Sequence, residues 1–221
     1  LLLSEVAPTW IGKDRNKSFM LAKENGADCI VMDDGFQNPT LQKDFSIVVI
    51  NGEQGFGNKR VIPSGPLRES ISRGLSRTNL VITIGDISET VKNKIPRHIP
   101  LIAANFKIKE NDIMLKGQSV TAFAGIAYPE KFFNSLKLVK ANIVDKISYS
   151  DHHIYSEDDL LYLAEIANKN KSILVTTKKD MVRIPKNFRS LVKTIDGFIE
   201  LDDEKLLLEI LSNLIENKIN Q

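Results

Sequence analysis

The segment CIVMDDGFQ, Cys29 to Gln37, decides how the first part of this chain is expected to fold. Its apolar run, Cys29 to Met32, predicts a buried strand, and Asp33 and Asp34 follow it directly. In open α/β sheets, ligands bind at the carboxyl ends of the strands. A hydrophobic strand that ends in aspartate is typical of a Walker B motif, whose carboxylate holds Mg²⁺ against nucleotide phosphates.

A simpler interpretation stays open at this point. Asp33, Asp34 and Gly35 are also typical of a turn, because Asp-Gly is a favoured turn pair. Gln37 lies two residues past the glycine, where its amide could reach back to a phosphate or to metal-bound water. The residues alone therefore indicate either a magnesium site or a turn.

Strand and helix patterns alternate along the chain, which predicts an α/β fold with parallel strands. The first region is expected to comprise residues 1–100, with glycine and proline residues marking the loops. Its predicted strands are Thr9–Gly12, Cys29–Met32, Ser46–Ile50 and Leu80–Ile84, and its predicted helices are Asp14–Asn25 and Leu67–Leu75.

A connecting hairpin is expected over residues 101–116, formed by Leu101–Lys109 and Ile113–Leu115. The alternation restarts beyond a boundary near Lys116, which predicts a second, smaller α/β domain over residues 117–221. Its predicted strands are Val120–Ala124, Val144–Ser148, Ser172–Thr176 and Lys193–Glu200, and its predicted helices are Pro129–Leu136, Glu157–Asn168 and Asp203–Asn217.

A glycine-rich stretch, Asn51 to Gly65, separates a predicted strand from a predicted helix and is expected to be a functional loop. Arg68 follows it in the segment GPLRE, where a guanidinium could bind a phosphate with two hydrogen bonds. The alternative is a surface arginine paired with Glu69. Lys59 and Arg60 add positive charge that could face an anionic glycolipid or membrane surface.

Asp151 and His152 precede Ser156, whose spacing to Asp159 predicts a capping box. The pair is therefore expected in the loop before a helix. An imidazole there could orient a catalytic carboxylate or relay its proton, whereas the alternative is a surface histidine beside an aspartate that satisfies loop amides. The adjacent His153 is expected to take no part in the chemistry.

Composition narrows the classes of protein. The chain has 30 basic and 28 acidic side chains, so its charge predicts no nucleic-acid partner. A single cysteine, Cys29, cannot form a disulfide within the chain or a thiolate metal site. No apolar run reaches the length of a membrane span, and no protein partner is evident.

The segment DDGFQNPTLQKDFSIVVINGEQGFGNKRVIPSGPLRE, Asp33 to Glu69, resembles the signature region of the tetraacyldisaccharide 4'-kinases, which phosphorylate the lipid A precursor. The resemblance continues, in the family's order, through the segments AFAGIAYPEKFF, YSDHHIYSEDDL and TTKKDMVRI. In the last segment, Lys178 stands where the family usually has glutamate. Lys179, Asp180 and Arg183 are expected to form structural pairs there.

The resemblance implies an incomplete P-loop-like sheet in the first domain and transfer of the ATP γ-phosphoryl group to the 4'-hydroxyl of tetraacyldisaccharide 1-phosphate. It makes Asp33 and Asp34 the carboxylates that hold Mg²⁺, with Gln37 near the phosphates. Arg68 and His152 become catalytic candidates, His152 together with Asp151. The expected location is peripheral, at the cytoplasmic face of a Gram-negative inner membrane.

The chain contains no GxxxxGK[ST] segment, the phosphate-binding loop that such a kinase needs. The expectation is therefore that a kinase fragment of this sequence is inactive alone. Two other functions stay open: a non-catalytic lipid- or nucleotide-binding remnant, and a phosphohydrolase whose metal is held by Asp33, Asp34, Asp151 and His152.

Overall fold

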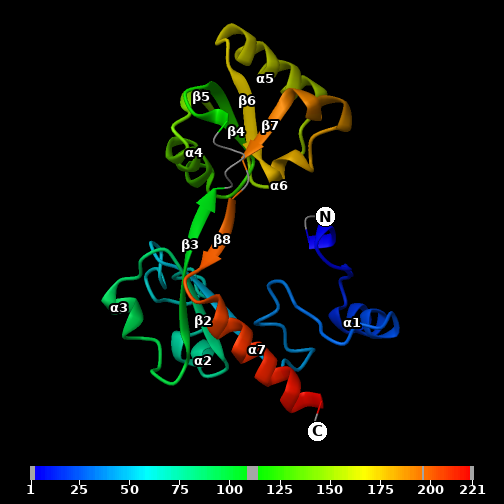
Figure 1. The fold of residues 1–221 in the computed structure, drawn as a ribbon, viewed down its shortest axis with the longest axis vertical. Helices are drawn as coiled ribbons and strands as arrows, with labels where there is room; N and C mark the ends of the chain where they lie inside the picture. Colours follow the sequence, from blue (N-terminus) through cyan, green and yellow to red (C-terminus); the bar gives the residue numbers. More distant parts are fainter. Residues whose placement is uncertain (1–2, 109–113, 196, 220–221) are drawn as a thin grey trace. The chain divides into compact units, whose positions relative to one another are not determined.

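The computed structural model describes residues 3–108, 114–195 and 197–219. The chain forms two compact units. The N-terminal unit comprises Pro8–Phe106 and Ile199–Gln221, and the central unit comprises Lys107–Phe198 together with Leu1–Ala7. Figure 1 shows a sheet in each of them. The mixture of helices with parallel strands confirms the predicted α/β class.

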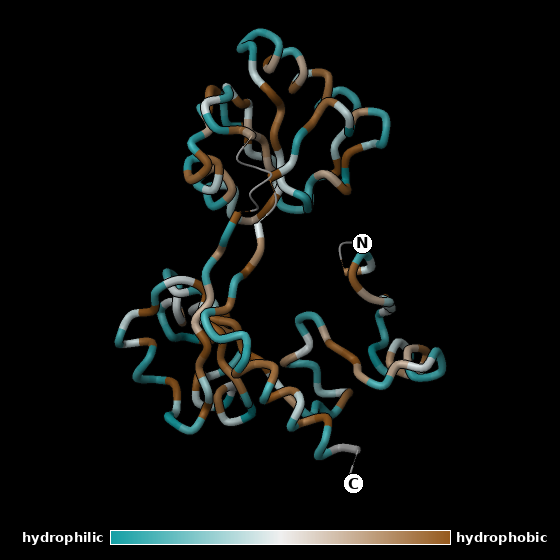
Figure 2. The backbone as a smooth tube through the Cα atoms, viewed as in Figure 1, coloured by the Kyte–Doolittle hydropathy of each residue, from teal (hydrophilic) through white to brown (hydrophobic). Residues whose placement is uncertain are grey.

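The central unit contains a parallel four-stranded sheet in the order β5-β4-β6-β7. Its strands are β4 (Ser119–Ala124), β5 (Asn142–Ser148), β6 (Ile173–Thr177) and β7 (Val192–Ile195). Its helices are α4 (Pro129–Leu138), α5 (Glu157–Lys169), α6 (Lys178–Met181) and the 3₁₀ helix η3 (Lys186–Leu191), with η1 (Leu3–Glu5) in the N-terminal segment. In Figure 2, β6 is hydrophobic and the loop before it is hydrophilic.

The inner strands of the central sheet, β4 and β6, are buried on both faces. Alternate side chains of a strand point to opposite faces, so each of these faces needs its own cover. Val120 and Ala122 pack with Phe133 and other residues of α4. Phe123 packs instead with Leu163 and other residues of α5. This double burial explains why the strands are continuous apolar runs, as expected for a parallel sheet.

The N-terminal unit contains a second four-stranded sheet, in the order β1-β2-β3-β8. Its strands are β1 (Ile47–Asn51), β2 (Leu80–Ile84), β3 (Leu101–Ile108) and β8 (Gly197–Leu201), and its helices are α1 (Arg15–Glu24), α2 (Ile71–Leu75), α3 (Glu89–Lys92) and α7 (Glu204–Ile219). The first three strands pair in parallel. Ile50, Val81, Leu75 and Val91 form its core with neighbouring residues of the loops.

The compact units divide the chain differently from the predicted domains. The chain leaves the N-terminal unit within β3 and returns to it within β8, so that α7 belongs to the N-terminal unit. The predicted second domain, residues 117–221, included this helix. The central unit is therefore flanked along the chain by parts of the N-terminal unit.

The predicted strand at Cys29–Met32 is wrong. The segment has no strand conformation, Cys29 is exposed, and Val31 is 91% exposed. No described strand pairs with it, and Ile30 and Val31 are exposed. Asp33 and Asp34 consequently follow an extended segment and form a turn, as the alternative interpretation had it. The short strand predicted at Thr9–Gly12 is also absent.

Other predicted elements differ in detail. The first arm of the predicted hairpin is β3, which lies between β2 and β8 instead of pairing with the second arm. Ile113 lies outside the described residues, and Met114 and Leu115 form no strand. The strand predicted at Lys193–Glu200 is divided between β7 and β8, which belong to different sheets. Across the described helices, none is long and apolar enough to cross a membrane.

Candidate functional site

The turn after Met32 is joined to the segment GPLRE by an ion pair. Both terminal nitrogens of Arg68 lie 3.4 Å from one carboxylate oxygen of Asp34. The side chains are 59% and 71% exposed, respectively. Asp34 has a φ of +50°, which a non-glycine residue adopts only where the surrounding chain holds it. The structure thus brings together two of the predicted site residues, although they are 34 positions apart.

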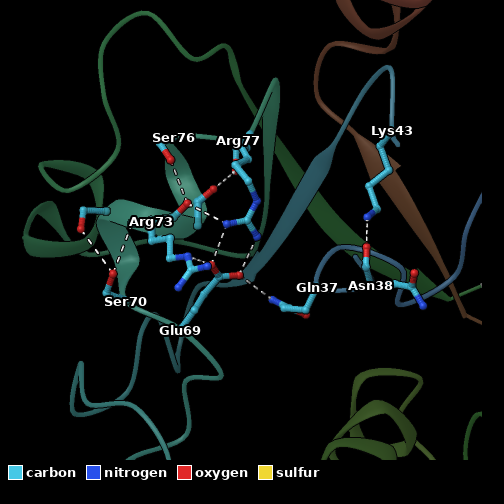
Figure 3. A network of polar contacts seen from close by, with 11 residues as sticks. Gln37, Asn38, Lys43, Glu69, Ser70, Arg73, Ser76 and Arg77 are labelled. Carbon is cyan, nitrogen blue, oxygen red and sulfur yellow. Dashed lines mark hydrogen bonds and ion pairs between the residues drawn. The ribbon is translucent and has the colours of Figure 1, made fainter. Parts of the chain in front are cut away.

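Arg68 does not pair with Glu69, as the alternative interpretation supposed. Glu69 accepts two hydrogen bonds of 2.8 Å from Arg77, and Arg73 lies 4.0 Å away (Figure 3). The Arg77 hydrogen bonds lower the pKa of Glu69 below its usual value of 4.5, and they outweigh the opposing effect of burial. Glu69 is therefore ionised, and its carboxylate pairs with Arg77 and Arg73.

Gln37 is held by the same carboxylate. Its Nε2 donates a hydrogen bond of 3.3 Å to Glu69 (Figure 3). The guanidinium of Arg77 lies 4.9 Å from the ring centre of Phe36. These contacts fix the segment that follows Asp34 against α2. The sequence did not predict the ion pair between Glu69 and Arg77. The two residues are eight positions apart, on either side of α2, and the conformation of that segment brings them together.

An open cavity of about 340 Å³ lies beside this network. It is lined by Phe36 and Gln37, by Asn51 at the end of β1, and by Arg68 and Ser70 before α2, among others. The cavity runs along β1 from Val48 to Asn51 and so includes the carboxyl end of the strand, where open α/β sheets bind ligands. The volume falls at the lower end of the range for small-molecule sites.

The glycine-rich stretch is irregular, as predicted, and its end is closed by backbone hydrogen bonds. Ile62 donates to the carbonyl of Leu67 over 2.8 Å, and Leu67 donates to that of Arg60 over 3.2 Å. Gly65 packs so closely that a β-carbon there would collide with the Arg60 carbonyl. The loop therefore fixes the backbone immediately before Arg68.

Asp151 and His152 lie in the loop before α5, as predicted. Ser156 and Asp159 form the predicted capping box. The backbone N–H of His152 donates to the carbonyl of Gly125 over 3.1 Å, and its φ is +61°. The ring is exposed, with Nε2 3.7 Å from Asp151 and Nδ1 3.1 Å from Arg183.

His153 has a different environment from its neighbour. Its Nε2 lies 3.0 Å from a carboxylate oxygen of Asp159, and its ring stacks on Tyr149 with a centroid distance of 4.5 Å. Tyr155 contacts the same ring edge to face. These contacts give His153 a packing role, and its expected absence from the chemistry stays a prediction.

The segment TTKKDMVR forms the end of β6 and the short helix α6. Thr177 caps that helix through a hydrogen bond to the N–H of Asp180. Asp180 is fully buried and pairs with Arg183 at 3.2 Å. The predicted structural pairing therefore involves Arg183, whereas Lys179 is exposed.

Asp33 and Asp34 have the donor chemistry that Mg²⁺ prefers, since this ion binds through one or two carboxylates together with phosphate oxygens and water. Among the residues that the structure describes, no three histidine, cysteine, aspartate or glutamate side chains form a cluster that could hold a metal ion. The two carboxylates thus fit a magnesium ion shared with phosphates and do not make a site by themselves. The described residues give no support to the four-ligand phosphohydrolase site.

Comparisons with known proteins agree with one another. A family model described as tetraacyldisaccharide-1-P 4'-kinase (LpxK) matches residues 1–216. The tetraacyldisaccharide 4'-kinases of Gluconobacter oxydans and Rhodospirillum rubrum are each 43% identical to the chain, over 88% and 96% of it and over 60% and 65% of their own lengths. The chain thus spans less than two thirds of these relatives.

A solved structure has a similar fold. It is a crystal structure of LpxK from Aquifex aeolicus in complex with ATP, with a TM-score of 0.67 and 20% sequence identity. The match covers 90% of this chain and 62% of that one.

Proposed function

Because the chain belongs to the tetraacyldisaccharide-1-P 4'-kinase family, we propose that it takes part in transferring the γ-phosphoryl group of ATP to the 4'-hydroxyl of tetraacyldisaccharide 1-phosphate. The observation that carries this proposal is the family match, which extends over residues 1–216. The reaction is a step of lipid A biosynthesis. The chain contains no GxxxxGK[ST] loop, so the roles proposed for it are those of the residues that it does contain.

In the N-terminal unit, the residues that we propose take part in the reaction are the ion pair between Asp34 and Arg68 together with Asp33. An exposed ion pair has a small net energy, so a ligand of higher charge can replace either partner. Phosphate oxygens would take the guanidinium of Arg68, which suits their geometry and charge. This exchange would leave the carboxylate of Asp34 free for a cation.

Asp33 and Asp34 are the residues that we propose to hold Mg²⁺, and Gln37 lies beside them. A bound Mg²⁺ neutralises charge on the phosphates during transfer. The hydrogen bond from Gln37 to Glu69 fixes the chain just beyond the two aspartates, so their turn is anchored from one side. Arg68 anchors it from the other.

Asp151 and His152, in the central unit, are a second group of residues that we propose take part in the reaction. The exposed imidazole would orient a reacting carboxylate or relay its proton. The carboxylate of Asp151 lies on the Nε2 side of the ring at 3.7 Å, where it favours a proton on that nitrogen. The positive φ of His152 is a strained conformation of the kind that clusters at active sites.

The lipid substrate places the proposed reaction at a membrane surface, at the cytoplasmic face of an inner membrane. Lys59 and Arg60 are exposed in the glycine-rich stretch. Each basic residue near an anionic membrane contributes about 1 kcal/mol of attraction. We propose that this stretch faces the lipid.

The test uses the complete gene product that carries these residues, assayed with labelled ATP, Mg²⁺ and tetraacyldisaccharide 1-phosphate. We expect Asp34→Ala and Arg68→Ala each to lower lipid phosphorylation by about 100-fold or more, as removal of a charge-stabilising group does in other enzymes. Arg73→Ala is the matched control, because Arg73 is an exposed cation near Arg68 that does not line the cavity.

Two outcomes would contradict the proposal. One is wild-type phosphorylation in both variants, which would remove the Asp34 and Arg68 pair from the site. The other is a complete gene product that folds but transfers no phosphate to the lipid. A loss in Arg73→Ala as large as that in Arg68→Ala would show that the assay reports general surface charge and would also count against the assignment.

A further inference from the structure

Arg183 is the hub of a small network in the central unit. Its Nη1 donates to the carbonyl of Gly125 over 2.9 Å and to Asp180 over 3.2 Å. Its Nη2 lies 3.1 Å from Nδ1 of His152. One guanidinium therefore connects a buried carboxylate with the exposed imidazole of the proposed site.

The base of this network is rigid because Asp180 is fully buried. The Thr177 hydroxyl donates to Asp180 over 2.7 Å, and the backbone N–H of Asp180 donates back to that hydroxyl over 3.1 Å. Arg183 is itself only 19% exposed. A buried, hydrogen-bonded ion pair of this kind holds its partners in one geometry, since a half-broken pair leaves a buried charge uncompensated.

The chemistry of the two groups determines where the proton of the imidazole lies. A guanidinium has only donors, so Nδ1 of His152 must offer a lone pair to Arg183. In a neutral ring the proton is then on Nε2, which is the nitrogen that lies 3.7 Å from Asp151. His152 is thus presented as a hydrogen-bond donor through Nε2.

The backbone is held by the same network. The carbonyl of Gly125 accepts from the N–H of His152 as well as from Arg183. A β-carbon at Gly125 would lie 3.0 Å from Cβ of His153, 3.1 Å from the Tyr155 hydroxyl and 3.2 Å from Asp180. Because Gly125 has no side chain, the loop that carries His152 can approach the end of β4. This closeness allows the Gly125 carbonyl to accept from both the His152 N–H and Arg183.

We propose that Arg183, anchored by Asp180, is a positioning residue that sets the tautomer and orientation of His152, so that Nε2–H points to the reacting groups. This inference rests on the proposed function only where it gives His152 a part in the reaction. The ring geometry and the tautomer are properties of the chain itself. They can be measured without any activity.

The first experiment is therefore ¹⁵N NMR of the imidazole nitrogens in this chain, at mildly alkaline pH. The chain has only three histidines, so a His152→Gln variant assigns the signals. We expect His152 to show a fully unprotonated Nδ1 and a protonated Nε2. Arg183→Met should move both signals towards an average, Arg183→Lys should restore part of the separation, and Lys179→Met, which removes a neighbouring exposed cation, should change neither.

A proton on Nδ1 in the wild type, or spectra that are unchanged in Arg183→Met, would overturn the proposal. Urea unfolding of each variant shows whether the chain is folded. Should Arg183→Met fail to fold, Arg183→Lys provides the same comparison. The ammonium group keeps the charge, but its single nitrogen cannot replace both Nη1 and Nη2 of the guanidinium.

The second experiment measures the kcat of the complete gene product. We expect Arg183→Met to lower kcat by about 10-fold to 100-fold, a loss typical of removing a group that orients a functional histidine. If Arg183 acts through His152, adding Arg183→Met to His152→Ala should cause no further loss. Losses that multiply would indicate a general structural role and would overturn the proposal.

The two experiments separate the possible failures. A gene product without lipid kinase activity would refute the proposed function, whereas the NMR result would still decide the role of Arg183. A correct tautomer with multiplying kinetic losses would instead reject the link between Arg183 and catalysis.

Discussion

The molecule contains two aspartate–arginine pairs at its candidate site residues, and they differ in almost every physical respect. Asp34 and Arg68 meet at 3.4 Å from segments far apart along the chain, with most of both side chains in solvent. Asp180 and Arg183 meet at 3.2 Å within one turn, with the carboxylate fully buried. The exposed pair is suited to exchanging partners, and the buried pair is suited to holding a neighbour in place.

This difference follows from the surroundings of each pair. Water screens the exposed charges and competes for their hydrogen bonds, so the pair contributes little to stability. The side chains of Thr177 and Arg183 bind the carboxylate of Asp180 and help to offset its desolvation. The comparison predicts opposite outcomes for similar substitutions, in stability and in function.

The largest effect is expected at Asp180. Asp180→Ala leaves Arg183 with an uncompensated charge in a mostly buried position, which should lower the free energy of unfolding by about 3–5 kcal/mol. Chemical denaturation of the purified chain measures this value. A loss below 1 kcal/mol, about that of a surface ion pair, would remove the distinction between the two pairs.

Gly125→Ala is expected to have the next largest effect. The added methyl group would be 3.0–3.2 Å from three neighbours, and overpacking of this kind typically costs about 1–3 kcal/mol. Gly74→Ala is the matched control, because Gly74 lies in α2 with no atom closer than 3.8 Å to the added carbon. It should stabilise the helix by about 0.5–1 kcal/mol. Thermal unfolding would compare the two; equal melting temperatures would contradict the prediction.

The exposure of Glu69 lies between that of the exposed Asp34 and that of the buried Asp180, since its side chain is 15% exposed. Its pKa is lowered in the folded state, mainly by the hydrogen bonds from Arg77. The resulting stabilisation is therefore present above the unfolded-state value of 4.5 and is lost as the pH falls through the lower folded-state pKa.

Arg77→Met should remove this contribution. Hydrogen bonds to charged groups are typically worth about 1.5–3 kcal/mol, and the partial exposure of Arg77 places the expected loss near the lower value. Unfolding experiments from neutral pH to pH 3 should show converging stabilities for wild type and variant as acid protonates Glu69. If the difference in free energy of unfolding between wild type and Arg77→Met stays constant with pH, the loss of stability comes from packing and not from the charge of Glu69.

The smallest effect on stability is expected at the exposed pair. Asp34→Asn and Arg68→Met should each change the free energy of unfolding by less than about 0.5 kcal/mol. Denaturation of the purified chain measures this. A loss of several kcal/mol in either variant would mean that this pair, like the buried one, is structural.

The sequence predicted β6 and the segment Cys29–Met32 by the same reasoning, from short apolar runs, and only β6 formed a strand. Both runs carry side chains that suit a sheet. The difference lies in pairing, because β6 has a strand on each side and Cys29–Met32 has none among the described residues. Pairing is a tertiary property, which a run of four residues does not encode.

Predictions from local patterns were more accurate, because the interacting residues lie within a few positions of each other in the sequence. The capping box of Ser156 and Asp159 was predicted from spacing and confirmed. The structural pairing of Asp180 was also expected, but the choice of Arg183 over Lys179 depends on α6 turning Asp180 inward. The link from Arg183 to His152, 31 positions away, could not be read from the sequence, because it exists only where the loop before α5 approaches α6.

The route of the chain through β3 and β8 has a practical consequence for dissection of the protein. Residues 107–198 form one uninterrupted stretch, whereas the N-terminal unit is assembled from segments on both sides of it. Residues 107–198 are in this sense an insertion, and a fragment of these residues contains the whole central unit except the segment before Pro8. The N-terminal unit requires either a linker that replaces the insert or co-expression of Ile199–Gln221, since β8 forms an edge of its sheet.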